Sequence, residues 1–177
     1  MVTATRGFDM VLACLALVLA VADDPISPTT SPVGRYTVRF PRLPKTDTKE
    51  LAVGNGVTVP VVTAKADGKD GLVFAVVYAD YPPEFREVSA DKLLAGVRDG
   101  LKGKDGILTR DKPITFGADK LPAREVTVEA GKNAHNAVRA VLVLSGQRLY
   151  QVMVTGPKDA VGKKPADEFF KSFELTR

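Results

Sequence analysis

The chain has 177 residues, which is the size of a single domain with one hydrophobic core, and 45% of them are hydrophobic. Its 25 Lys and Arg residues outnumber its 21 Asp and Glu residues. In a protein outside the cytoplasm, this net charge of +4 favours acidic proteins, anionic envelope polymers or lipid headgroups over nucleic acid as partners. The single cysteine, Cys14, lies in an N-terminal apolar run, so the rest of the chain cannot hold an intramolecular disulfide, a thiolate metal site or a cysteine nucleophile.

Residues 1–22 have the pattern of an export signal. Arg6 precedes an unbroken apolar run from Met10 to Val21, and Ala20-Val21-Ala22 supplies the small residues that signal peptidase requires. The sequence therefore predicts an exported protein, periplasmic or extracellular, that begins near Asp23 after cleavage.

Two other interpretations of this N-terminus are weaker. The apolar run has twelve residues, whereas a helix that crosses a bilayer needs about 20, so we expect no stable membrane span after cleavage. Lipid anchoring through Cys14 would leave only a few apolar residues before the cleavage site, with Asp9 just upstream.

Residues 23–33 are rich in Pro, Ser and Thr, which predicts a flexible linker, and residues 34–177 are then a single domain. From Arg35 to Phe40 apolar and polar residues alternate, which predicts a half-buried strand with Tyr36, Val38 and Phe40 on its inner face. Pro41 and Pro44 end it.

Two segments rich in β-branched residues, 57–66 and 72–79, flank Asp67-Gly68-Lys69-Asp70-Gly71 and predict an antiparallel hairpin. Pro60 cannot donate a ladder hydrogen bond, so we expect the first arm to lie near an edge or to carry a bulge. The run from Leu72 to Val77 is apolar throughout and indicates a central strand.

The next segment predicts a helix from its N-cap at Ser89 to about Lys102, with Gly103 as its stop. Its apolar stripe consists of Leu93, Leu94, Val97 and Leu101.

Four more strands follow, at 107–116, 124–129, 136–144 and 148–155, and the short turn Ser145-Gly146-Gln147 joins the last two. A final helix begins near Pro165 and carries one stripe of Ala166, Phe169, Phe170 and Phe173. This order predicts an α+β fold, an antiparallel β-sheet flanked by helices.

The chain lacks a convincing cofactor motif, so we predict no cofactor and no metal site. His135 is the only histidine, and its surroundings are those of a turn. The loop from Gly156 to Lys164 has the wrong glycine spacing for a phosphate-binding loop and lacks the hydroxyl that would hold magnesium. Gly54-Asn55-Gly56 likewise reads as a turn rather than the start of a dinucleotide site.

Acidic residues cluster at two places. Asp67 and Asp70 lie in the hairpin turn, and they do not follow the alternating pattern of a calcium-binding loop. Asp80, Glu84 and Glu87 surround Tyr81-Pro82-Pro83. They leave open a weak cation site, or a hydrolase that uses Asp80 and Glu84 with a nearby tyrosine, Tyr78 or Tyr81.

The clearest basic group consists of Arg35, Arg39, Arg42 and Lys45. A row of charges of this kind is usually the solvated face of a strand. The functional interpretation is a docking patch for an acidic envelope protein or polymer, whose binding would weaken with salt.

Several patterned segments occur together in residues 34–177. They are Tyr36-Thr37-Val38-Arg39-Phe40-Pro41, the hairpin, the Leu93-Leu94 helix, Arg148-Leu149-Tyr150-Gln151-Val152 and Phe169-Phe170-Lys171-Ser172-Phe173. In this arrangement the chain resembles the PsbP/Mog1-like domains, and most of all the exported bacterial members of that group. The resemblance implies an α-β-α sandwich that acts without catalysis, as an accessory subunit or binding partner. Photosystem members of the group assist metal and chloride retention and Mog1 members bind a small GTPase, and no residue motif carries either role to this chain.

Together these observations predict an exported, monomeric, non-enzymatic protein of the cell envelope that acts as a binding or accessory module. An envelope hydrolase and a purely structural domain remain the alternatives.

Overall fold

The computed structural model describes residues 28–54, 57–131 and 135–176. The predicted export signal, the lipidation alternative at Cys14 and the centre of the Gly54-Asn55-Gly56 turn lie outside these residues. Within the described residues, no helix is long and apolar enough to cross a membrane.

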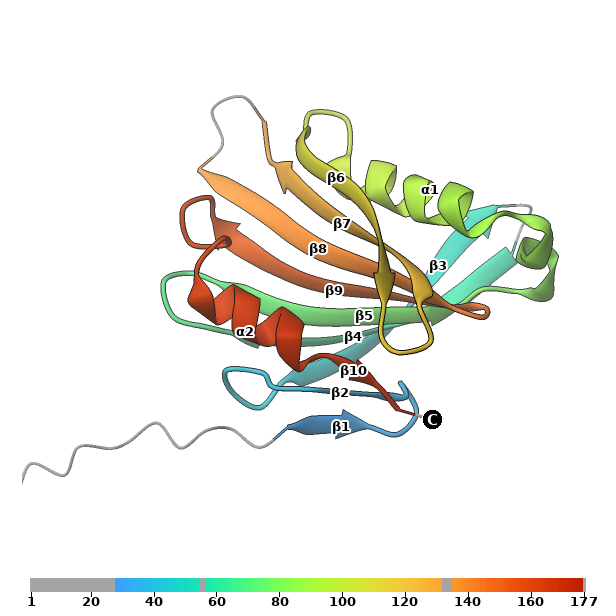
Figure 1. Ribbon diagram of the computed structural model, residues 1–177, viewed down its shortest axis with the longest axis horizontal. Coiled ribbons are helices and arrows are strands. Elements are labelled where there is room, and N and C mark those ends of the chain that lie inside the picture. Colours follow the sequence, from blue (N-terminus) through green and yellow to red (C-terminus); the bar gives the residue numbers. More distant parts are fainter. Residues whose placement is uncertain (1–27, 55–56, 132–134, 177) are drawn as a thin grey trace, which may run out of the picture.

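A seven-stranded antiparallel sheet forms the centre of the domain, in the order β3-β4-β5-β9-β8-β7-β6 (Figure 1). A second sheet has three short strands, in the order β1-β2-β10. The strands are β1 (Thr29–Ser31), β2 (Tyr36–Val38), β3 (Lys45–Gly54), β4 (Val57–Asp67), β5 (Val73–Asp80), β6 (Ile107–Phe116), β7 (Leu121–Glu129), β8 (Asn136–Ser145), β9 (Arg148–Pro157) and β10 (Glu174–Leu175). The helices are the 3-10 helix η1 (Pro83–Glu87), α1 (Ala90–Lys102) and α2 (Lys164–Ser172).

Alternation of side chains along the strands divides the core into two clusters. On one face of the large sheet, Leu94 of α1 packs against Val126 of β7 and Leu142 of β8. On the other face, Phe169 of α2 and Tyr36 of β2 pack with residues of β4, β5 and β9. Figure 1 shows α1 on one side of the large sheet, and α2 with the small sheet on the other.

The predicted class, an antiparallel sheet with helices, is confirmed in this coarser form. The finer prediction, a sandwich with a helical layer on each face, is not. The domain is dominated by its strands, and the small sheet β1-β2-β10 shares with α2 the layer that a second set of helices would occupy.

Local signals located most elements correctly. The side chain of Ser89 accepts a hydrogen bond from the Lys92 amide, which caps α1, and the chain leaves the helix at Gly103 with φ of +60°. The strands β4 and β5 form the expected hairpin, and β5 is buried on both faces. The β8–β9 hairpin closes through the predicted turn.

Two features differ from the sequence analysis. Residues 29–31, which we expected in the linker, form β1 because their backbone pairs with β2. The charged segment that becomes β3 gave no strand signal, and it forms the edge strand next to β4.

The first hairpin arm, β4, lies near an edge as expected, one strand in from it. Pro60 is tolerated because the ladder between β4 and β5 starts only at Val61, so the proline has no strand partner on that side.

Candidate functional site

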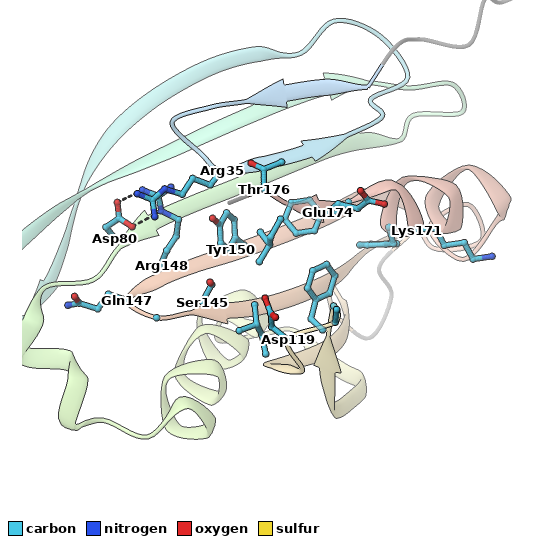
Figure 2. A pocket seen from close by; sticks show the side chains of 18 residues that line it. Arg35, Asp80, Asp119, Ser145, Gln147, Arg148, Tyr150, Lys171, Glu174 and Thr176 are labelled. Atoms are coloured by element: carbon cyan, nitrogen blue, oxygen red, sulfur yellow. Dashed lines mark hydrogen bonds and ion pairs between the residues drawn. The ribbon is translucent and has the colours of Figure 1, made fainter.

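A cleft of about 1060 Å³ opens at one end of the large sheet (Figure 2). Five segments that are distant in sequence form its walls: the β1–β2 turn, the end of β5, the β6–β7 turn, the β8–β9 turn with the start of β9, and the chain from the end of α2 to Thr176. Its lining residues are Arg35, Asp80, Phe116, Gly117, Ala118, Asp119, Leu121, Ser145, Gly146, Gln147, Arg148, Tyr150, Phe170, Lys171, Phe173, Glu174, Leu175 and Thr176.

The floor of the cleft is aromatic. The Phe173 ring lies 5.6 Å from the Phe116 ring and 5.9 Å from the Tyr150 ring, measured between centroids. Tyr36 packs behind them, 5.7 Å from Phe173 and 6.2 Å from Tyr78. Burial raises the pKa of Tyr36 to about 12. Edge-on and tilted contacts of this kind favour rigid packing. Tyr150 and Phe173 are only 2% and 3% exposed, so the apolar surface open to a ligand comes from the partly buried rings of Phe116 and Phe170 above them.

One end of the cleft is held by an ion pair between Arg148 and Asp80. The Arg148 Nε donates to Asp80 Oδ1 at 2.6 Å and its Nη2 donates to Oδ2 at 2.5 Å, a bidentate arrangement. The guanidinium also lies 5.0 Å from the centroid of the Tyr78 ring. The hydrogen bonds from Arg148 hold the pKa of Asp80 below its usual range, and the same bonds raise the pKa of Arg148.

The β1–β2 turn is fixed to this end by three hydrogen bonds to its carbonyl oxygens. Arg148 Nη1 donates to the Val33 oxygen at 2.6 Å, and the Tyr150 hydroxyl donates to the Gly34 oxygen at 2.9 Å. The Thr176 amide donates to the Arg35 oxygen at 2.9 Å. Arg35 adopts a left-handed backbone conformation with φ of +53°, which is unfavourable for a residue with a side chain. These bonds hold the residue in that conformation beside the cleft.

At this end of the cleft, Arg35 carries a positive charge that no ion pair among the described residues neutralises. Within residues 28–54, 57–131 and 135–176, its guanidinium makes no hydrogen bond or ion pair, while Arg148 is neutralised by Asp80. Arg35 lies close enough for its charge to contribute to lowering the pKa of Asp80. Figure 2 shows Arg35, Arg148 and Asp80 together at one end, with Lys171 and Glu174 toward the other.

A second cleft of about 510 Å³ lies between β6, β7, β8 and the segment that leads into α2. Its charged side chains are paired with one another. The pairs are Arg110 with Glu125 at 2.5 Å, Lys158 with Glu129 at 2.8 Å and Arg139 with Asp167 at 2.5 Å. Because these charges compensate one another, this cleft is a weaker candidate for binding.

The structure does not gather the predicted basic group around one site. Arg35 lines the cleft, whereas the exposed residues Arg39, Arg42 and Lys45 follow β2 and lead into β3 at the edge of the large sheet. The Arg39 amide donates to the Ser172 hydroxyl at 2.9 Å, which ties the backbone there to α2. Only the first member of the group therefore contributes to the cleft.

The predicted acidic clusters separate in the same way. Asp80 forms an ion pair with Arg148, while Glu84 and Glu87 lie exposed on η1 and do not line the cleft. Asp67, the last residue of β4, and Asp70, in the β4–β5 turn, are both exposed. Among the described residues, no group of three or more His, Cys, Asp or Glu side chains could hold a metal ion.

Sequence reasoning missed Arg148, Tyr150 and Asp119 as cleft residues. A local signal for both members of the ion pair is present, because Arg148 begins β9 and Asp80 ends β5. Each is therefore a charged residue at the end of a strand. Their pairing depends on β5 lying beside β9 in the sheet, and the two residues are 68 positions apart in the sequence.

No family model and no curated protein matches the chain. A comparison with solved structures finds the solution structure of PsbP from the cyanobacterium Synechocystis sp. PCC 6803, with a TM-score of 0.58 and 13% sequence identity. The match covers 88% of this chain and 95% of that one. This domain has the PsbP-like fold. At 13% identity the likeness concerns the path of the backbone, so the cleft of this PsbP-like domain is assigned from its own residues.

Proposed function

We propose that this PsbP-like domain is an exported, non-enzymatic accessory protein of the cell envelope, and that it binds an acidic partner through the cleft. The observation that carries the proposal is the aromatic floor next to the uncompensated charge of Arg35. Apolar surface provides affinity, and one fixed charge at its margin orients a ligand. The likeness of the fold to cyanobacterial PsbP and the predicted export signal support an accessory role outside the cytoplasm.

The geometry favours binding over hydrolysis. Both oxygens of Asp80 accept hydrogen bonds from Arg148, and its lowered pKa makes it a weak general base, because proton transfer is most efficient when the pKa lies near the working pH. Glu84, the second carboxylate of the hydrolase alternative, does not line the cleft. The carboxylates that this alternative requires are therefore not brought together there.

The test is affinity capture of the tagged protein from its own envelope fraction after cross-linking, comparing wild type with Arg35→Glu. Arg42→Glu is the matched control, because Arg42 is exposed, belongs to the same basic run and does not line the cleft. We expect a stoichiometric partner that is retained by Arg42→Glu and lost with Arg35→Glu. Thermal melts of both variants confirm that they are folded.

Three results would contradict the proposal. Equal loss with both variants would assign binding to the extended basic run rather than to the cleft. If the wild type captures no partner, or if Arg35→Glu captures as much partner as the wild type, the cleft is excluded as the docking site.

A further inference from the structure

We propose that the cleft binds an extended segment of a partner polypeptide, which adds as a strand to the free edge of β10 and carries a bulky apolar residue and an Asp or Glu side chain. This inference rests on the proposed function, because it defines the ligand of the same cleft. Three features carry it: an unpaired strand edge, the direction of side chains along that edge, and the charge of Arg35.

The edge belongs to β10, one of the two outer strands of the small sheet, and on its side away from β2 it pairs with no other strand among the described residues. The Thr176 amide points toward β2, because it donates to the Arg35 oxygen at 2.9 Å. In an antiparallel ladder successive residues point their N–H and C=O groups to opposite sides. Leu175 pairs across from Tyr36, so its N–H and C=O point away from β2, and Leu175 also lines the cleft. Such an edge can pair with an added strand.

Three other strands of the described residues lie at a sheet edge, and they are less suited to strand addition. None of the residues of β1, the other outer strand of the small sheet, lines the cleft. The edge strand β3 carries Lys45, Asp47, Lys49 and Glu50, all exposed, and charged side chains at an edge discourage pairing. The opposite edge strand β6 carries Arg110, Asp111 and Lys112 at its middle. β10 carries an exposed charge as well, Glu174, and it differs from β3 and β6 because it borders the aromatic cleft.

Side-chain direction places an apolar residue of the ligand on the floor of the cleft. Leu175 packs against the core cluster on the α2 side of the sheet. A ligand residue directly opposite Leu175 would point its side chain to that same face, where the partly buried rings of Phe116 and Phe170 line the cleft. The next side chain on this face comes two residues along the strand, about 7 Å away. A ligand can therefore present two side chains to the cleft from one short segment.

The second side chain would be acidic because of Arg35. Its guanidinium is uncompensated within the described residues, and its backbone is fixed next to β10 by the Thr176 hydrogen bond. An ion pair formed at the edge of an apolar surface orients the ligand. A chain-terminal carboxylate is usually bound by a group of backbone N–H groups, whereas this end of the cleft offers a side-chain guanidinium. The geometry points to an internal Asp or Glu.

The experiment measures binding of a fluorescein-labelled peptide, acetyl-Thr-Phe-Thr-Asp-Thr-amide with the label on an added lysine, by fluorescence anisotropy with protein purified from cells that express the full chain. The second probe replaces the peptide's Asp by Asn. We expect the Asp peptide to bind wild-type protein at least fivefold more tightly than the Asn peptide, and Arg35→Gln to abolish that difference.

The strand edge is tested with a pair of variants at one position. Leu175→Pro removes the outward N–H and leaves the ladder to β2, whereas Leu175→Ala loses the same packing and keeps the N–H. We expect the Asp peptide to bind Leu175→Pro at least fivefold more weakly than Leu175→Ala. Equal binding by these two variants overturns strand addition, and equal affinity of the two peptides for wild type overturns the acidic requirement.

The outcome also separates this inference from the proposed function. If affinity capture depends on Arg35 but the peptide does not bind, the cleft is a docking site and the extended-peptide ligand is wrong. If neither the peptide nor an envelope partner depends on Arg35, both proposals fail.

Discussion

Above pH 10, we expect the free energy of unfolding to fall in the wild type and to fall less in the variant Tyr36→Phe. Tyr36 is 2% exposed, and burial raises its pKa from the ordinary 10.0 to about 12. Above pH 10 the unfolded chain releases the phenolic proton while the native state retains it. The unfolded state then binds fewer protons, so the free energy of unfolding falls as the pH rises. Phenylalanine has no proton to release.

The magnitude follows from the difference between the two pKa values. One pH unit corresponds to about 1.4 kcal/mol for each proton, so the wild type should lose about 1.4 kcal/mol relative to Tyr36→Phe between pH 9 and pH 11. Near pH 8 the two proteins should differ only by a constant cost of about 0.5–1.5 kcal/mol for the lost hydrogen bond between the Tyr36 hydroxyl and the Ser31 side chain. The measurement is urea unfolding followed by circular dichroism at intervals from pH 8 to pH 11.

A urea slope of about 1–3 kcal/mol/M converts the expected change into a shift of roughly 0.5–1.4 M in the difference between the two midpoints. Absorbance titration of the phenolates provides a second readout, since Tyr36→Phe should remove a group that ionises late in the native protein. A difference in the free energy of unfolding that stays constant from pH 9 to pH 11 would refute the reasoning, because the phenol would then ionise equally in both states.

Three further predictions concern packing, each measured by thermal and urea unfolding. Gly34→Ala should destabilise the domain by about 1–3 kcal/mol, because the new Cβ would lie 2.6 Å from Ser31 Oγ and from a Tyr36 ring carbon. Its control, Gly96→Ala, has open space in α1 and should stabilise by about 0.5–1 kcal/mol, so melts that coincide would contradict the predicted clash. Phe169→Ala should cost about 3–5 kcal/mol of unfolding free energy, because Phe169 is buried in the core. Phe170→Ala should cost less, because Phe170 is only partly buried beneath the Arg139 guanidinium. The reverse order would mean that the packed face of α2 is misassigned. Arg124→Met should cost about 1–3 kcal/mol, since Arg124 is buried and pairs with carboxylates of both α1 and β6, and a stable variant would show that those pairs contribute nothing net.

Local patterns were sufficient for most elements of this fold. The stripe of α1 and its cap at Ser89, the apolar run of β5 and the short β8–β9 turn are each determined by neighbours within a few residues. The α2 stripe was recognised as well, although Phe170 is only partly buried and contacts Arg139, with the guanidinium 4.8 Å from the ring centroid. Periodicity identifies the direction of a side chain, but not how completely its neighbours cover it.

Elements that depend on a distant partner were missed. The described residues of β3 are exposed, so the strand carries no apolar alternation, and it is a strand only because β4 offers its edge. The three residues of β1 bury little and are ordered by pairing with β2. Backbone hydrogen bonds between strands depend on the partner's position, which residue type does not encode.

The sequence alone determined the class of the domain, most of its elements and the presence of Arg35 in a basic run. Only the tertiary structure decided that Arg35 lies at an aromatic cleft while Arg39, Arg42 and Lys45 do not. The physical reason is the distance in sequence between the contacts that build the site. Arg148 reaches Asp80 across 68 residues and the Val33 oxygen across 115, and such contacts exist only once the strand order has brought these segments together.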